Sequence, residues 1–321
     1  MTKRQKTNVR LAALALLCLA FSACAKQVAE RGNSGVGGLS KVLPVRIVTD
    51  DLGRRITVPT KISRVVSLAP SVTESLFAVG AGDRLVGVTT YCDYPESAKA
   101  IQKVGDTLNP NIETIVALKP DVVFVSGASQ LETFTDTLDR NGIAVYVMNP
   151  TRLEEIFHDL EQLGTMFDNY DEAERVAYAL EKRERAICGI TNGCLGRDKD
   201  GPAPDAVRVF VQISKEPLFT VGKTSFLNEL IQDAGGLLVT NTIESAFPKL
   251  SKETALALQP EAIILSDSAD NQEPNEVFKD SPAVKNGRVY KINADILSRP
   301  GPRLVDALEQ IAKDLHPEKF Q

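Results

Sequence analysis

The sequence predicts an α/β protein with two similar lobes that are joined by a helical segment. Short apolar runs alternate with helical stretches in both halves of the chain, which is the pattern of parallel sheets covered on both faces. Between these halves, residues 151–188 show only the helical spacing of apolar side chains. Residues 111–123 and 251–263 also share one helix–proline–strand pattern, in register. We therefore expect two pseudo-symmetric lobes, each built around its own sheet.

The first 43 residues are expected to direct export and to tether the chain. Residues 1–23 combine four basic side chains with an apolar run at 11–21, the pattern of a signal peptide, and this run is too short to span a bilayer comfortably. Phe21-Ser-Ala-Cys24 resembles the lipobox of bacterial lipoproteins, so we expect Cys24 to carry lipid. Residues 24–43 continue as a flexible, Gly-rich tether. A plain secretory signal is the alternative, but either reading puts the mature chain in the periplasm or at the cell surface.

The first lobe is expected over residues 44–150, and it begins with a β-hairpin around a turn at 50–53. Ser71 and Glu74 have the S-x-x-E spacing of a capping box, so Glu74 is expected to cap the helix that follows the first strand. The remaining elements of this lobe are strands at 64–68, 85–89, 121–125 and 144–148, and helices at 71–80, 111–118 and 131–140.

Residues 151–190 are expected to form a helical backbone, and residues 203–321 the second lobe. Apolar residues between 156 and 180 recur at helical spacing on a charged background, without a strand signal. The elements predicted for the second lobe are strands at 207–211, 262–265 and 288–292, and helices at 225–234, 251–258 and 302–315. The order of strands and helices thus follows that of the first lobe.

Composition and charge exclude several classes of function. The net charge is −5 although the first 23 residues hold four basic and no acidic side chains, so the mature chain lacks the basic balance of nucleic-acid binders. The chain has only two histidines, His158 and His316, which does not suit a Ser-His-Asp triad or a histidine-rich metal site. The G-x-S-x-G, Walker A and HExxH motifs are absent. We therefore expect neither an enzyme nor a nucleic-acid partner.

Cysteine spacing predicts one disulfide in the exported chain. Cys188 and Cys194 flank a short run of turn-forming residues, which favours a small-loop disulfide in an oxidising compartment. Two thiols supply only half of a tetrahedral metal shell and no histidine lies near them in sequence, so no metal is expected there. Cys92 would then be an unpaired thiol.

Three stretches of the first lobe, residues 64–74, 85–95 and 109–121, closely resemble the cobalamin-binding proteins of bacterial ABC importers. The likeness covers about residues 45–316, and Ser298-Arg-Pro-Gly-Pro-Arg303 also occurs in the wider group that carries ferric siderophores and haem. This resemblance implies the class III periplasmic binding protein fold, of the helical-backbone metal-receptor type, in which one long rigid helix joins two Rossmann-like lobes. It also implies a monomer without a resident cofactor, which captures cobalamin between its lobes and touches the membrane only through its lipid.

Position in the fold indicates which residues line this cleft. Ligands of open parallel sheets lie outside the carboxyl ends of the strands, and two such edges that face each other can enclose a bulky molecule. The residues that we expect to bind ligand are Pro70, Ser71, Tyr91, Tyr94, Ser126, Gly127, Phe219, Phe247, Asp295 and Arg299. The resemblance places aromatic ligand contacts at Tyr91 and Phe247. Relatives often contact the corrin with tryptophan, which this chain lacks, and Thr107 stands where one might be expected. A ferric siderophore or haem is therefore the alternative ligand, and Tyr91 is the candidate axial ligand for haem.

Two glutamates are expected to contact the permease. Glu113 and Glu253 lie at matching positions in the first turn of the helix in the shared pattern. A first-turn carboxylate can simply complement the helix dipole, which accounts for one such residue but not for a matched pair. The resemblance implies that these two carboxylates dock onto arginines of the two permease subunits, one from each lobe.

Overall fold

The computed structural model describes residues 44–127, 131–196 and 205–321. The predicted signal peptide, Cys24 and the tether therefore lie outside the described residues. The chain divides into two units, residues 1–44 and 45–321, and the second unit contains both lobes and the helices between them. In the described part of the chain, no helix combines the length and the apolar character that crossing a bilayer requires.

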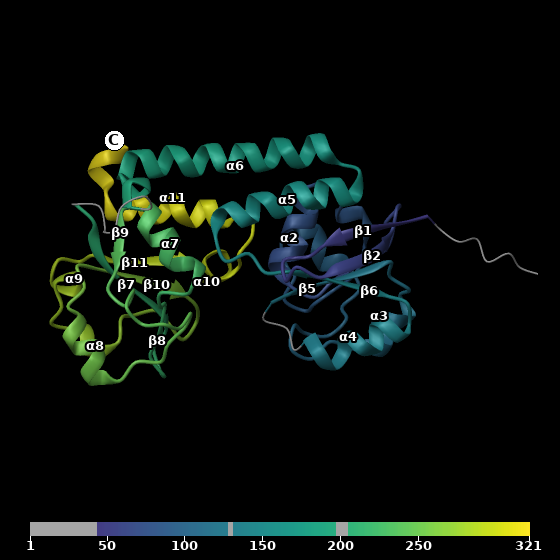
Figure 1. The fold of residues 1–321 in the computed structure, drawn as a ribbon. Helices are drawn as coiled ribbons and strands as arrows, with labels where there is room; N and C mark the ends of the chain where they lie inside the picture. Colours follow the sequence, from purple (N-terminus) through teal and green to yellow (C-terminus); the bar gives the residue numbers. More distant parts are fainter. Residues whose placement is uncertain (1–43, 128–130, 197–204) are drawn as a thin grey trace, which may run out of the picture. The chain divides into compact units, whose positions relative to one another are not determined.

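The first lobe has the predicted hairpin and a four-stranded parallel sheet (Figure 1). The hairpin pairs β1 (Val45–Thr49) with β2 (Arg55–Pro59), and the sheet has the order β4-β3-β5-β6. Its strands are β3 (Val65–Ser67), β4 (Leu85–Val88), β5 (Val122–Ser126) and β6 (Ala144–Met148). Its helices are α2 (Pro70–Ala78), α3 (Ile112–Ala117) and α4 (Leu131–Arg140), with short 3₁₀ turns η1 (Gly82–Arg84) and η2 (Glu96–Ala100). All the strands and helices predicted for this lobe are present.

The second lobe is built around β7, which pairs with β10 on one side and with two short strands on the other. Its strands are β7 (Val207–Ser214), β8 (Phe219–Thr220), β9 (Gly236–Leu238), β10 (Ala262–Asp267) and β11 (Val289–Asn293). Its helices are α7 (Phe226–Asp233), α8 (Lys252–Leu258), α9 (Pro282–Lys285), α10 (Ala294–Ser298) and α11 (Leu304–Leu315), with 3₁₀ turns η4 (Glu276–Phe278) and η5 (Pro317–Phe320). Strands β8 and β9 were not predicted, because two or three residues carry no readable alternation.

The parallel strands of the two lobes have the same order in space. The order β4-β3-β5-β6 in the first lobe corresponds to β9-β7-β10-β11 in the second, and both run second, first, third, fourth along the chain. In each lobe the strand order reverses between the first and third strands, β3 and β5 or β7 and β10. This reversal is the switch point at which open α/β sheets bind ligands. The predicted pseudo-symmetry is therefore present in the connectivity of the sheets.

The linking segment is a pair of helices rather than one continuous helix. Helix α5 (Leu153–Phe167) ends at Asp168, whose left-handed backbone (φ 58°) stops the helix. Helix α6 (Tyr170–Thr191) then runs back along α5 and ends at Asn192, followed by η3 (Gly193–Gly196). In Figure 1, α6 extends over both lobes, so this 22-residue helix corresponds to the long helix that the family resemblance implies.

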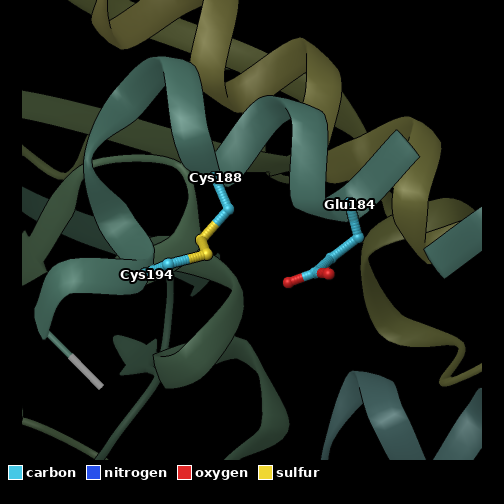
Figure 2. Close-up of side chains that lie close together, drawn as sticks. All are labelled: Glu184, Cys188 and Cys194. Carbon is cyan, nitrogen blue, oxygen red and sulfur yellow. A yellow bond between two sulfur atoms is a disulfide. The ribbon is translucent and has the colours of Figure 1, made fainter. Parts of the chain in front are cut away.

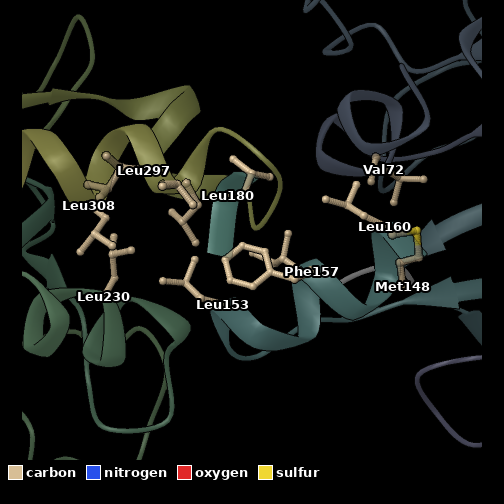
Figure 3. Close-up of a cluster of buried hydrophobic side chains, with 14 of the residues drawn as sticks. Val72, Met148, Leu153, Phe157, Leu160, Leu180, Leu230, Leu297 and Leu308 are labelled. Carbon is tan, nitrogen blue, oxygen red and sulfur yellow. The ribbon is translucent and has the colours of Figure 1, made fainter. Parts of the chain in front are cut away.

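One hydrophobic core extends through both lobes. Figure 3 shows part of this cluster: Val72 and Met148 come from the first lobe, Leu153 and Phe157 from α5, and Leu230, Leu297 and Leu308 from the second lobe. Smaller clusters lie on one face of each sheet, around Val123 in the first lobe and around Phe210 in the second. The two lobes therefore share one continuous hydrophobic core through the linking helices.

The structure corrects the capping box expected at the start of α2. The N-cap residue of this helix is Ala69, which makes no side-chain cap, and Pro70 occupies the first turn. The Glu74 side chain is 2% exposed and bonds to two arginines of the second lobe. The prediction was wrong because the helix begins before Ser71, which places Glu74 too far along the helix to cap its first amides.

Candidate functional site

A cavity of about 410 Å³ lies between the two lobes, at the carboxyl edge of the first sheet. The first lobe lines it with the start of α2, with Thr107 and with residues that end or follow β5 and β6. The second lobe lines it with the start of α7, one loop and the segment at the end of α10. The lining residues are Ala69, Pro70, Ser71, Val72, Thr107, Ser126, Gly127, Met148, Asn149, Pro150, Thr151, Thr224, Ser225, Phe226, Ala246, Phe247, Ser298, Arg299 and Pro300. Most of this surface is apolar, and it fits a bulky ligand with few charges.

The cavity gathers part of the predicted ligand-binding set. Its lining includes Pro70, Ser71, Ser126, Gly127, Phe247 and Arg299. Tyr91, Tyr94, Phe219 and Asp295 lie outside this lining. Tyr91 is 61% exposed but close to the rim, because its carbonyl accepts a hydrogen bond from Arg299 at 3.3 Å. Phe219 lies in the extra strand β8 at the edge of the second sheet, where it pairs with Lys249 in a bridge.

The sequence analysis missed two parts of the cavity lining, residues 148–151 at the end of β6 and the start of α7. Thr224, Ser225 and Phe226 line the cavity, and the Ser225 side chain caps α7 by accepting from the amide of Leu227 at 3.3 Å. The symmetry expected between the two lobes could have identified the start of α7 as part of the cavity. Helix α7 follows the first strand of its lobe as α2 does, so the start of α7 corresponds to Pro70 and Ser71. The sequence analysis considered only the residues directly after β7. It therefore missed the start of α7, because the short strand β8 lies between β7 and this helix.

A network of ion pairs joins the two lobes beside the cavity. Arg299 Nη1 donates to Glu74 Oε1 at 3.2 Å and to Asp93 Oδ1 at 2.8 Å, while Nη2 donates to Asp295 Oδ1 at 2.7 Å. Arg303 donates through Nε to Glu74 Oε2 at 2.8 Å and through Nη2 to Glu74 Oε1 at 2.5 Å. Glu74 and Asp93 belong to the first lobe, and the other three side chains to the second. We call these five residues the inter-lobe ion cluster.

The inter-lobe ion cluster also explains the position of Tyr94. The guanidinium of Arg303 lies 4.0 Å from the centre of the Tyr94 ring, a cation–π contact. Burial raises the pKa of Asp93, but the hydrogen bond and charge of Arg299 outweigh it and hold this pKa below its usual range. The hydrogen bond from Arg303 to Glu74 raises the pKa of Arg303 in turn. The two arginines of the cluster are therefore committed to protein partners.

A second cavity, of about 750 Å³, lies between the hairpin and α5 and contains a carboxyl pair. Asp159 is 5% exposed, and its side chain lies against that of Asp51. Burial, together with the neighbouring charge of Asp51, raises the pKa of Asp159 to about 8. Asp51 also accepts a hydrogen bond from the amide of Asn149, a residue that lines the cleft. Near neutral pH the pair therefore holds a proton.

Glu113 and Glu253 occupy equivalent, exposed positions on α3 and α8. Asn111 and Ser251 cap these helices by accepting from the amides of Thr114 and Thr254, at 2.9 and 3.2 Å. Both helices lie on the side of their lobes away from α6 (Figure 1). The two carboxylates are thus presented in the same way by the two lobes.

Matching arginines hold the far ends of the same two helices. Arg64 donates to the carbonyl of Leu118 at 2.6 Å, and Arg208 donates to that of Leu258 at 2.8 Å. The repeated pattern therefore includes the contacts that fix α3 and α8 on their sheets.

Cys188 and Cys194 form a disulfide at the end of α6, with their Cα atoms 5.3 Å apart. The carboxylate of Glu184, one helical turn before Cys188, lies near this disulfide (Figure 2). These three side chains place possible metal-ligand atoms within 4.8 Å of one another, but sulfurs that are bonded to each other are not thiolate ligands. The free cysteine Cys92 is buried and lies 3.1 Å from the hydroxyls of Thr73 and Thr89.

Comparison with known proteins assigns the chain to one family. The periplasmic binding protein family matches residues 65–296. An uncharacterized ABC transporter substrate-binding lipoprotein, YvrC of Bacillus subtilis, is 28% identical over 97% of both chains. A vitamin B12-binding protein of Vibrio vulnificus is 31% identical over 78% of this chain and 89% of that protein. The crystal structure of the periplasmic vitamin B12-binding protein BtuF of Vibrio cholerae has a TM-score of 0.70 at 29% identity, over 81% of this chain and 99% of that one.

These relatives are named as binding proteins, in agreement with the prediction that the chain is not an enzyme. The match to the family covers most of both lobes and the linking helices. The chain belongs to the periplasmic binding protein family.

Proposed function

We propose that this chain is the extracytoplasmic substrate-binding component of an ABC importer, and that it captures a corrinoid in the cleft and delivers it to a permease. The observation that carries the choice of ligand is the lining of the cavity between the lobes. It is mostly apolar, and its one arginine, Arg299, is already paired with three carboxylates. The names of the vitamin B12-binding relatives support the same ligand.

The chemistry of a corrinoid fits this lining. A corrin is a flat macrocycle with apolar faces and amide groups around its edge, so it needs apolar contacts and a few hydrogen-bond partners. Phe226 and Phe247 supply aromatic surface from the second lobe, and Ser71, Ser126 and Asn149 supply polar groups from the first. The enclosed volume covers only part of so large a ligand. The rest would extend past the rim, where Tyr91 is exposed.

A ferric siderophore or haem fits the described cavity less well. Haem binding usually needs an axial histidine or tyrosine. His158 lies on α5 and lines other cavities, and Tyr91 and Tyr94 lie outside the lining of the cleft. Anionic siderophores need unpaired cationic groups, whereas Arg299 is bound to Glu74, Asp93 and Asp295. The corrinoid is therefore the better candidate.

Delivery to the permease would use Glu113 and Glu253. The two lobes present these carboxylates from equivalent helix starts, and a permease built from two like subunits could offer one arginine to each. Charge-assisted Glu–Arg pairs fix orientation as well as affinity. Before docking, lipid on Cys24 would hold the protein at the membrane, as the lipoprotein name of the Bacillus subtilis relative supports.

Calorimetry on the mature chain tests the choice of ligand. We expect cyanocobalamin to bind with a Kd of about 1 μM or tighter, whereas haemin and a ferric catecholate bind at least about 100-fold more weakly. Tight binding of haemin or of the catecholate, with none of cyanocobalamin, would show that the ligand assignment is wrong.

A pair of aromatic variants tests whether the cavity is the binding site. Phe247→Ala should weaken cyanocobalamin binding by about tenfold or more, because this half-exposed ring lines the cavity. The control is Tyr178→Ala, since Tyr178 is also an exposed aromatic residue but lies on α6, outside the cleft. Equal affinities for these two variants would locate the site elsewhere.

A further inference from the structure

We propose that Glu74, Asp93 and Asp295 are specificity-determining residues, because they neutralise Arg299 at the cleft and thereby set the site against anionic ligands. This inference rests on the proposed function and adds to it a physical basis for selectivity. None of the three carboxylates lines the cavity, so they would act through Arg299, which does. They are positioning residues.

The guanidinium of Arg299 donates its hydrogen bonds to groups of the protein. Nη1 donates to Glu74 and Asp93, and Nη2 donates to Asp295 and to the carbonyl of Tyr91. The side chain is only 10% exposed. An anionic ligand could engage this arginine in the bidentate manner that carboxylates prefer only by displacing one of these partners.

The net charge of the inter-lobe ion cluster supports the same inference. Glu74, Asp93 and Asp295 carry three negative charges, and Arg299 and Arg303 carry two positive ones. Net negative charge beside the cavity repels an anion, and the low exposure of Glu74 and Arg299 limits screening by salt. A neutral corrinoid neither gains nor loses from this charge. The cluster should therefore affect the two classes of ligand differently.

The groups that pair with Arg299 come from both lobes, so the proposed selectivity against anionic ligands depends on how the lobes are arranged. Glu74 on α2 and Asp93 after β4 come from the first lobe, whereas Arg299 and Asp295 come from the second. The first lobe thus supplies most of the charge that neutralises an arginine of the second. In a chain without these two acids, the same arginine would face the cleft as an available cation.

The test uses the full mature chain and the two exposed members of the cluster. Asp93 and Asp295 have side chains that are 48% and 51% exposed, so replacing both by asparagine should leave the fold intact. The double variant Asp93→Asn/Asp295→Asn changes the cluster from a net negative to a net positive charge. We expect the affinity ratio of ferric catecholate to cyanocobalamin, measured by calorimetry, to rise at least about tenfold and the rise to shrink at high salt.

A charge-matched control removes two exposed acids far from the cleft. The variant Asp139→Asn/Glu161→Gln loses the same charge from α4 and α5, and we expect its affinity ratio to equal that of the wild type. Equal losses of affinity for both ligands in the cluster variant would show a merely structural role. An unchanged ratio would overturn the inference.

A second variant removes the buried acid. Glu74→Gln keeps the shape of the side chain and should shift the same ratio in the same direction, with folding checked by circular dichroism. If this variant does not fold, the variant of the exposed pair, Asp93→Asn/Asp295→Asn, still tests the inference.

The proposed ligand and the proposed role of the cluster fail in different ways. A wild type that does not bind cyanocobalamin contradicts the corrinoid assignment. A catecholate affinity that does not rise in the exposed-pair variant contradicts the role of the cluster, whatever the wild type prefers.

Discussion

The two lobes match on one side and differ on the other. Strand order, the capped helices α3 and α8, and the arginines that hold the far ends of these helices are equivalent in both lobes. At the cleft, each lobe contributes the start of a helix, α2 or α7, but the first lobe adds residues that end or follow β5 and β6, whereas the second adds two loop segments. The side that carries Glu113 and Glu253 is therefore symmetric, and the side that lines the cavity is not. This is the division that the proposed function predicts, with one asymmetric ligand in the cleft and two similar permease subunits at the docking side.

The comparison is most severely tested by truncating the central aromatic residue of each lobe. Phe124 and Phe210 are both fully buried, the first against Tyr146 and the second against Phe278. We expect Phe124→Ala and Phe210→Ala each to lower the free energy of unfolding by about 3–5 kcal/mol, measured by denaturant titration. Because one core joins both lobes, each variant should still unfold in a single transition. Two separate transitions would show that the lobes are independent.

The double variant Glu113→Ala/Glu253→Ala tests the symmetric side. It should reduce ligand uptake in a transport assay by more than about 100-fold, because each lost charge pair weakens docking by about 2 kcal/mol or more. Ligand affinity should stay within about twofold of the wild type, since both carboxylates are exposed and outside the cavity. Each single variant should have a similar, smaller effect. A large effect from one lobe only would show that docking does not follow the symmetry, and Glu161→Ala on α5 is the control.

Asp159→Asn tests a feature of the first lobe, the carboxyl pair between the hairpin and α5. The folded state holds the pKa of Asp159 at about 8, against an ordinary value of 3.8, so it binds a proton that the unfolded chain has lost. The wild type should therefore lose stability as pH rises from about 4 to 8. The variant should lack this loss and exceed the wild type at pH 8 by about 1–2 kcal/mol in thermal or denaturant unfolding. Parallel pH profiles for the two proteins would contradict the raised pKa.

The smallest effect concerns the acids that hold the first strand of each lobe. Asp121 accepts from the amides of Ser63 and Arg64 at 2.7 and 2.9 Å, whereas Glu261 accepts from one backbone amide among the described residues, that of Arg208, at 2.9 Å. Asp121→Ala should cost about 1 kcal/mol of stability and Glu261→Ala about half of that, because both sites are partly open to water. Denaturant titration of both variants gives the comparison, and a larger loss at Glu261 would reverse the expected order.

Local patterns were enough to predict most of the fold. Strands such as β5 and β10 are continuous apolar runs bounded by proline or polar residues, and the caps Asn111 and Ser251 mark where α3 and α8 begin. Strand β9 escaped notice because its pairing with β7 is a long-range property. The break at Asp168 lies within a pattern that reads as continuous helix, so periodicity alone did not reveal it.

The site was harder to predict because its contacts cross between the lobes. Positions after strands led to Ser126 and Gly127, which line the cavity, but the same rule also selected Phe219, which does not. Glu74 has the spacing of a local cap, and only the arginines of the second lobe explain its burial. Charge pairing between segments more than 200 residues apart has no signature in a single sequence.

The core shared through α5 and α6 limits how this scaffold could be re-engineered. Building a chimaera with one lobe of a related receptor would cut through packed side chains such as Leu153 and Phe157 rather than through an exposed linker. The natural unit for such a transplant is instead the set of cleft segments together with their neutralising acids, with Val72 and Met148 kept unchanged, since these two residues line the cavity and also belong to the core.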